Sequence, residues 1–251
     1  MAEPRAPRLA VLIDADNASP KIAAGLFEEI AQIGEASVRR IYGDFSRDNL
    51  KGWAGILAAY GILPHQNFAN TVGKNASDIA LVIDAMDLLH AERMDGFCIV
   101  SSDGDFTRLA ARLREQGADV YGFGERKTPE SFRQACRRFV YTENLLPGAR
   151  DAEEAAASAA PAAVESAGGG ARPPSAAAPL IRRAIAQLDE DEGGWVTLGG
   201  VGQRLLALAP DFDPRTFGSA KLVTLVERAS GFEIKRPDGR GVMVRAKPKC
   251  G

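Results

Sequence analysis

The chain has 251 residues, of which 45% are hydrophobic and 25% are charged, and its formal net charge is -2 at pH 7. These proportions suit a soluble globular protein of one or two domains, and the small net charge means that any nucleic-acid-binding surface must be local. No apolar run approaches the ~18 residues of a membrane span. The three cysteines are far apart and no signal peptide is recognisable, so we expect reduced thiols in a cytoplasmic protein.

The first part of the chain alternates between strand-like and helix-like segments. The expected strands are the apolar runs 9–13, 38–42, 62–63, 97–100 and 120–123, and the expected helices are 20–32, 49–60, 77–91, 105–116 and 129–136. Continuous apolar strands that alternate with helices predict an α/β fold, a parallel sheet covered by helices on both faces. In such sheets functional residues gather beyond the carboxyl ends of the strands, near the point where the strand order reverses.

Acidic residues follow two of the expected strands at the point where each strand ends. Asp14 follows the first strand, and Asp103 and Asp105 follow the fourth. Because the carboxyl ends of parallel strands meet at one edge of a sheet, we expect these carboxylates to lie close together. Asp16 and Asn17 come directly after Asp14 and add polar groups to the same place.

A further acid, Asp78, opens the expected helix 77–91. At 3.6 residues per turn it shares one helix face with the apolar residues Leu81, Val82, Ala85 and Met86. That face should pack on the sheet, which directs Asp78 toward the strand ends. Asp84 lies about 120° away around the helix, and Asp87 lies on another side. We expect both to face solvent or at most to contact the residues that form the site.

Converging carboxylates repel one another unless a cation compensates them. Mg²⁺ or Mn²⁺ accepts carboxylates and waters and leaves positions for phosphate oxygens, and a pair of such ions can promote phosphodiester cleavage. Zinc is disfavoured because the only histidines are His65 and His90, for which we expect structural roles.

Each aspartate also has an ordinary structural explanation. Asp105 is suited to cap a helix, Asp78 to interact favourably with a helix N-terminus, and Asp14 and Asp16 to form turns. Ser102 is suited equally to a capping or a supporting role. The coincidence of all the acids at one end of the sheet favours the metal site over these explanations.

Three stretches, LAVLIDADN, GKNASDIALVIDAMDLL and FCIVSSDGDFTRLAARLREQGADVYGFG, resemble the NYN family of PIN-like nucleases over residues 8–145. The resemblance implies a Rossmann-type parallel sheet and an acidic pocket that binds Mg²⁺ or Mn²⁺ and cleaves RNA. It places the catalytic, metal-binding carboxylates on Asp14, Asp78, Asp103 and Asp105, and supporting polar roles on Asn17 and Ser102, with Asp16 as an extra acid. Lys74 and Arg108 are candidates to hold phosphate near this pocket.

Residues 148–178 are rich in Ala, Gly, Ser and Pro and contain no aromatic residue. Such a composition buries too little apolar surface to offset its ordering entropy, which predicts a flexible linker.

The remaining residues, 179–249, carry helical apolar patterns followed by a hairpin signal. Leu180, Ile181, Ala184, Ile185 and Leu188 mark one helix, Val201, Leu205 and Leu208 a second, and Phe217, Leu222, Leu225 and Val226 a third. Two apolar runs then flank an Asp-Gly turn. Three helices and a hairpin predict a small winged-helix-like domain. The stretch FGSAKLVTLVE within it resembles the OST-HTH/LOTUS family, which implies RNA binding or docking of a protein partner.

The third expected helix and the hairpin also contain the local basic surface. Its members are Arg215, Lys221, Arg228, Lys235, Arg236, Arg240, Arg245, Lys247 and Lys249. Contacts of such residues with phosphates position a nucleic acid without reading its sequence. Helix-turn-helix geometry also permits DNA, and a merely solubilising surface is the structural alternative.

These features favour a metal-dependent endoribonuclease with a C-terminal RNA-binding or partner-docking domain. Toprim-like and haloacid-dehalogenase-like phosphotransfer domains fit less well, because the first strand ends in aspartate rather than glutamate and Ala18 stands where a hydroxyl is needed. The alternative from another class is a non-catalytic RNA-binding adaptor, which commonly lacks one of the carboxylates that this chain retains.

Overall fold

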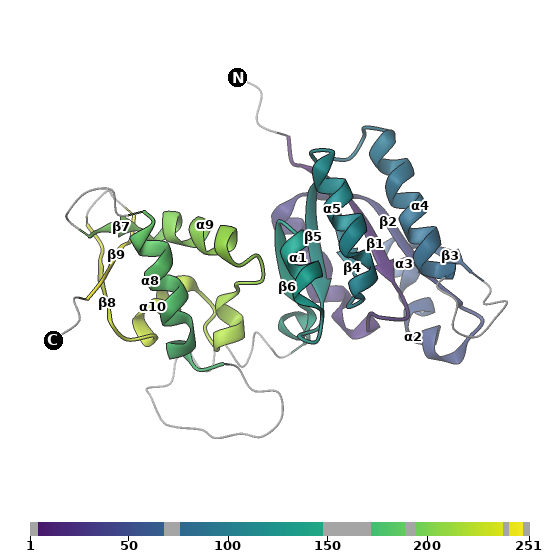
Figure 1. Ribbon diagram of the computed structural model, residues 1–251. Helices are drawn as coiled ribbons and strands as arrows, with labels where there is room; N and C mark the ends of the chain where they lie inside the picture. The colour runs from purple at the N-terminus through teal and green to yellow at the C-terminus, as the bar shows by residue number, and fades with distance from the viewer. Residues whose placement is uncertain (1–4, 68–75, 148–171, 189–193, 238–240, 248–251) are drawn as a thin grey trace. The chain divides into compact units, whose positions relative to one another are not determined.

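The computed structural model describes residues 5–67, 76–147, 172–188, 194–237 and 241–247 (Figure 1). The chain divides into two compact units, Met1–Pro147 and Gly148–Gly251. Most of the expected linker lies outside the described residues. Two of the expected phosphate-binding residues, Lys74 and Arg240, also lie outside them. The last residues of that stretch, Pro174–Ala177, form the 3₁₀ helix η5, and Ala177 is buried in the core of the second unit.

The first unit contains a six-stranded sheet. Its strands are β1 (Arg8–Asp14), β2 (Glu35–Gly43), β3 (Leu63–Gln66), β4 (Gly96–Val100), β5 (Asp119–Gly124) and β6 (Arg138–Tyr141). They lie in the order β3-β2-β1-β4-β5-β6, and every neighbouring pair is parallel. The predicted parallel α/β sheet is therefore confirmed, and the order reverses between β1 and β4. The edge strand β6 was not among the expected strands.

Helices cover both faces of this sheet (Figure 1). They are α1 (Ala23–Ile33), α2 (Lys51–Ala54), α3 (Leu57–Tyr60), α4 (Ala76–His90), α5 (Thr107–Glu115) and α6 (Glu130–Ala135). The single helix expected at 49–60 is two short helices, separated at Gly55. Glycine weakens a helix interior because it has the most backbone freedom to lose.

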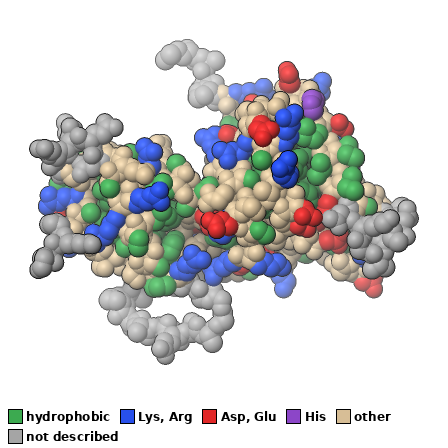
Figure 2. All heavy atoms as spheres, in the orientation of Figure 1, with side chains coloured by type: hydrophobic (Ala, Val, Ile, Leu, Met, Phe, Trp, Pro, Cys, Tyr) green, Lys and Arg blue, Asp and Glu red, His purple; other side chains and the backbone are tan. Residues whose placement is uncertain are grey.

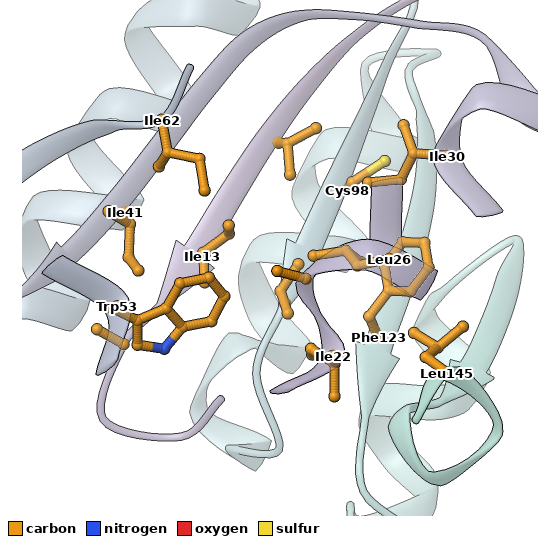
Figure 3. Close-up of a cluster of buried hydrophobic side chains, with 14 of the residues drawn as sticks. Ile13, Ile22, Leu26, Ile30, Ile41, Trp53, Ile62, Cys98, Phe123 and Leu145 are labelled. Atoms are coloured by element: carbon orange, nitrogen blue, oxygen red, sulfur yellow. The ribbon is translucent and has the colours of Figure 1, made fainter. Parts of the chain in front are cut away.

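Alternate residues of each central strand serve opposite faces of the sheet, as the two-residue period of a strand requires. Leu9, Val11 and Ile13 of β1 join the core under α1, together with Leu26 and Trp53 (Figure 3). Ala10 and Leu12 join the core under α4 and α5. In β4 the same alternation assigns Cys98 and Val100 to the first core and Phe97 and Ile99 to the second. This parity decides on which face the residues after each strand emerge.

The second unit packs three helices on a small antiparallel sheet, the arrangement expected of a winged helix. The helices are α8 (Ala178–Ala186), α9 (Leu198–Leu208) and α10 (Leu222–Arg228), and the strands are β7 (Val196–Thr197), β8 (Phe232–Lys235) and β9 (Met243–Ala246). The strand order is β7-β9-β8. Ile181, Val201, Leu225 and Val244 are fully buried at its centre, which confirms the helical apolar patterns.

Candidate active site

Asp14 is the last residue of β1 and is only 1% exposed. Its parity matches Ala10 and Leu12, so its side chain lies on the face that α4 and α5 cover. Burial raises its pKa, and hydrogen bonds partly oppose this. Oδ2 accepts hydrogen bonds from the Ser101 hydroxyl at 2.7 Å and from Nδ2 of Asn17 at 2.8 Å, and Oδ1 accepts one from the backbone N–H of Asp16 at 3.2 Å.

Ser101 connects the ends of β1 and β4. Its hydroxyl donates to Asp14 and accepts the backbone N–H of Asp103 at 3.0 Å. Sequence reasoning missed this residue and selected Ser102, whose hydroxyl instead accepts the backbone N–H of Glu125 at 2.9 Å, at the end of β5. The signal was available in the strand parity, because Ser101 continues the alternation of Phe97 and Ile99 toward Asp14.

Asp103 and Asp105 lie in the turn between β4 and α5. Asp103 is the N-cap of the 3₁₀ helix η3 (Gly104–Phe106), and its Oδ1 accepts the backbone N–H of Asp105 at 2.8 Å. Asp103 is partly exposed and Asp105 is exposed. The capping role expected for Asp105 thus belongs to Asp103.

Asp78 lies in the first turn of α4, whose Leu81 and Ala85 are buried against the sheet. Its pKa is raised to about 6, first by burial and then by the negative charges of Asp14, Asp103, Asp16 and Asp105, in that order. A carboxyl can be perturbed by four others only when all of them lie near it. The acids from two strand ends and one helix therefore share one electrostatic neighbourhood, at the point where the strand order reverses.

The chemistry of this donor set suits a hard divalent cation, because it consists of carboxylate oxygens. No group of three His, Cys, Asp or Glu side chains is close enough to hold an ion directly, within the part of the chain that the structure describes. Both oxygens of Asp14 accept internal hydrogen bonds, which fix its position. Asp14, Asp78, Asp103 and Asp105 are the residues that would hold such an ion.

Asp84 takes the supporting role that was the expected alternative to a solvent-facing position, and its side chain is 21% exposed. Its Oδ2 accepts hydrogen bonds from Arg40 at 2.8 Å and from the Tyr42 hydroxyl at 2.7 Å, and lies 3.4 Å from Nδ1 of His65. Burial, followed by the hydrogen bond to Asp84, raises the pKa of Tyr42. This polar cluster fixes α4 to β2 and β3, so it holds the helix that carries Asp78.

Arg108 is the expected phosphate-binding residue of the first unit that falls within the described part of the chain. It is exposed in the first turn of α5, three residues after Asp105.

In the second unit the expected basic residues fall into different environments. Arg215 is mostly buried, and its guanidinium pairs with Asp213 through bonds of 2.6 to 3.0 Å, so this charge is already compensated. Lys221 is exposed. Arg236 is exposed and pairs with Glu227 at 3.0 Å.

Sequence reasoning missed Trp195 in this unit. Nζ of Lys235 lies 4.2 Å from the centre of its ring, and Cζ of Arg245 lies 4.8 Å from it. Trp195 directly precedes β7, so an aromatic ring and two cations meet at one end of the small sheet.

The parallel sheet and its acidic edge define a nuclease-type α/β domain. The NYN domain model matches residues 8–145, and the chain belongs to the NYN family. Residues 174–244 match the OST-HTH/LOTUS domain, a type of domain that binds RNA. No curated protein matches the chain.

Among solved structures, the chain is similar to a crystal structure titled as a protein of unknown function, VPA0982, from Vibrio parahaemolyticus. The two are 20% identical, and the match covers 58% of this chain and 99% of that one with a TM-score of 0.49. Within the described residues no helix is both long and apolar enough to cross a membrane.

Proposed function

We propose that the protein is a metal-dependent endoribonuclease that cleaves RNA at the acidic edge of its NYN domain. The observation that carries the proposal is the hydrogen-bonded link from Asp14 through Ser101 to the backbone of Asp103, because it joins the two strand ends that supply acidic residues. Such an arrangement is costly for folding and is explained by a bound divalent ion.

In this proposal Asp14, Asp78, Asp103 and Asp105 bind Mg²⁺ or Mn²⁺, which supplies charge compensation at the scissile phosphate and acidifies a bound water. The hydrogen bonds from Asn17 and Ser101 keep Asp14 in one orientation. Ser102 supports the turn from its other side through Glu125. Asp16 adds negative charge that favours the cation, and Arg108 contacts a phosphate of the substrate.

The C-terminal unit binds the RNA and raises its local concentration at the site. Lys221, Lys235 and Arg236 contribute phosphate contacts, and Trp195 offers apolar surface between two cations. We infer that Arg240 and Lys74 belong to the phosphate-contacting set on sequence grounds alone. Phosphate contacts serve RNA and DNA alike, so DNA is a substrate to be tested beside RNA.

The test is incubation of the purified chain with end-labelled single-stranded RNA, structured RNA and single-stranded DNA, each with Mg²⁺, Mn²⁺ or EDTA. We expect cleavage of RNA with either metal and none with EDTA. Thermal unfolding with and without Mn²⁺ gives a second readout, because a ligand that binds only the folded state raises Tm. RNA binding without metal-dependent cleavage, and with an unchanged Tm, would identify the non-catalytic adaptor instead.

A further inference from the structure

An apolar groove runs beside the acidic site. It is a cavity of about 240 Å³ between α4 and the turn that precedes α5, and it is lined by Asp78, Ile79, Val82, Ile83, Asp105 and Phe106. Ile79 is 60% exposed and Ile83 is 55% exposed. Figure 2 shows hydrophobic side chains gathered over α4, on the side next to α5. The groove is therefore open to solvent along a helix that is otherwise anchored to the sheet.

The exposure of these two isoleucines is unusual for this chain. The described residues contain four exposed large hydrophobic side chains, and Ile79 and Ile83 are two of them, one turn apart on one helix face. Single exposed aliphatic residues need no explanation, whereas a lined apolar groove is typical of a binding site. The other two, Leu63 and Leu146, do not line the groove.

The groove is continuous with the acidic site because two of the proposed metal-binding carboxylates belong to both. Asp78 lies at one end of its α4 wall, next to Ile79 in the chain, and Asp105 precedes Phe106 on the opposite wall. An RNA whose scissile phosphate lies at the acidic site, as proposed above, would have an adjoining sugar and base within reach of the isoleucines. Any occupant of the groove must tolerate two carboxylates at its border, which disfavours an acidic peptide or a phosphate.

We propose that this groove binds the base of one nucleotide next to the scissile phosphate of the RNA. The inference rests on the function proposed above. A base has flat apolar faces that fit between aliphatic side chains, and its exocyclic amino groups can donate to carboxylates at the edge. The volume is below the ~300 Å³ at which sites for drug-sized ligands begin, so it suits one ring system rather than a peptide helix. Every base has an apolar face, so contact of the isoleucines with that face does not require a particular base, as in base stacking.

The direct test observes the isoleucine methyl groups and needs neither metal nor cleavage. The full chain, labelled at isoleucine δ1 methyls, is titrated in EDTA and low salt with a single-stranded hexaribonucleotide, and then with versions that carry one abasic position each. Ring currents of a bound base should shift the signals of Ile79 and Ile83, and one abasic position should abolish the shift. The methyl of Ile30, in the core of the first unit on the opposite face of the sheet, is the internal reference.

The functional test combines a protein change with a substrate change. Ile83→Ala removes three carbon groups and should lower kcat/KM for the intact oligonucleotide by about tenfold or more, because each group buried against the base contributes about fourfold. The same variant should cleave the critical abasic oligonucleotide as well as the wild type does, because the two changes remove the same interaction. Leu63→Ala is the matched control, since Leu63 is 58% exposed on β3 and lies outside the groove.

Three results would overturn the proposal. The first is a methyl shift that is equal for intact and abasic RNA. The second is an equal loss of kcat/KM by Ile83→Ala on both substrates. The third is a mass in light scattering that falls from dimer to monomer in Ile83→Ala, which would make the groove an interface between two copies. If the wild type cleaves nothing, the proposed function fails, while the methyl titration still decides whether a base enters the groove.

Discussion

The hydroxyl of Ser101 donates a 2.7 Å hydrogen bond to Oδ2 of Asp14, across the boundary where the strand order of the sheet reverses. Burial of Asp14 raises its pKa, and the hydrogen bonds that its carboxylate accepts lower it. The loss of one donor should therefore favour the protonated form of Asp14. The same hydroxyl accepts the backbone N–H of Asp103, which connects the two strand ends that supply most of the acids.

Replacement of this serine gives the first prediction. Ser101→Ala should lower the free energy of unfolding by about 1–3 kcal/mol, because the buried Asp14 carboxylate loses one of its donors and the backbone N–H of Asp103 loses its acceptor. It should also reduce cleavage, since Asp14 and the Asp103 turn lose their common support. Urea unfolding and the RNA cleavage assay measure the two effects.

Ser102→Ala is the matched control for this change. It removes a hydroxyl that contacts Glu125 rather than an aspartate, so it should reduce cleavage much less than Ser101→Ala at a comparable loss of stability. Equal cleavage by both variants would show that the hydrogen bonds of Ser101 are dispensable for the site.

The second prediction concerns Asp103. Asp103→Asn should abolish Mn²⁺-dependent cleavage and leave the fold intact, because an asparagine Oδ1 can still accept the Asp105 N–H as an N-cap while its neutral amide binds a cation poorly. Asp87→Asn, at an exposed position of α4, is the control and should cleave at the wild-type rate. Wild-type cleavage by Asp103→Asn would exclude Asp103 as a metal ligand.

The third prediction is a pH dependence of stability in the metal-free protein. The pKa of Asp78 is raised from 3.8 to about 6, and that of Asp14 is raised as well. A carboxyl that binds its proton more tightly in the folded state stabilises the fold below its unfolded pKa, and this contribution is lost as pH rises through the folded value. The stability of the first unit should therefore fall between about pH 4 and pH 6 as these groups ionise.

Two comparisons isolate the origin of this effect. Asp78→Asn should flatten the fall in Tm between about pH 4 and pH 7 and should be more stable than the wild type at neutral pH. Mn²⁺ should raise the wild-type Tm at about pH 7 and raise it less at about pH 5, where protons compete for the carboxylates. A pH profile of Tm that is identical in wild type and Asp78→Asn would contradict the crowded-carboxylate interpretation.

The fourth prediction separates structural from RNA-binding cations in the second unit. Arg215→Gln should destabilise this unit by about 3 kcal/mol or more, because it leaves the buried carboxylate of Asp213 without its partner. Lys235→Gln combined with Arg236→Gln should leave the stability of the second unit nearly unchanged. It should reduce the slope of log RNA affinity against log salt concentration by about 0.7 for each phosphate that the variant no longer neutralises. An unchanged salt slope would instead indicate that this unit docks a protein.

The sequence alone determined the parallel α/β architecture of residues 8–145 and the small helical domain after it. Apolar periodicity is local information, and it indicated neither the edge strand β6 nor the break in the helix expected at 49–60. The choice of Asp14, Asp103 and Asp105 also followed from the sequence, because residues at the ends of parallel strands must share one edge of the sheet.

Only the tertiary structure decided which partner each polar side chain has. Ser101 and Ser102 are equivalent by composition, yet the parity of β4 directs the first toward Asp14 and the second toward Glu125. Asp84 was expected to face solvent or at most to support the site, and only the fold shows that Arg40 and Tyr42 of β2 are its partners. Arg215 belongs to a basic stretch in the sequence but pairs with Asp213 in the fold. Hydrogen bonds and charge compensation depend on distances between segments far apart in the chain, and those distances exist only once the sheet and its helices have packed.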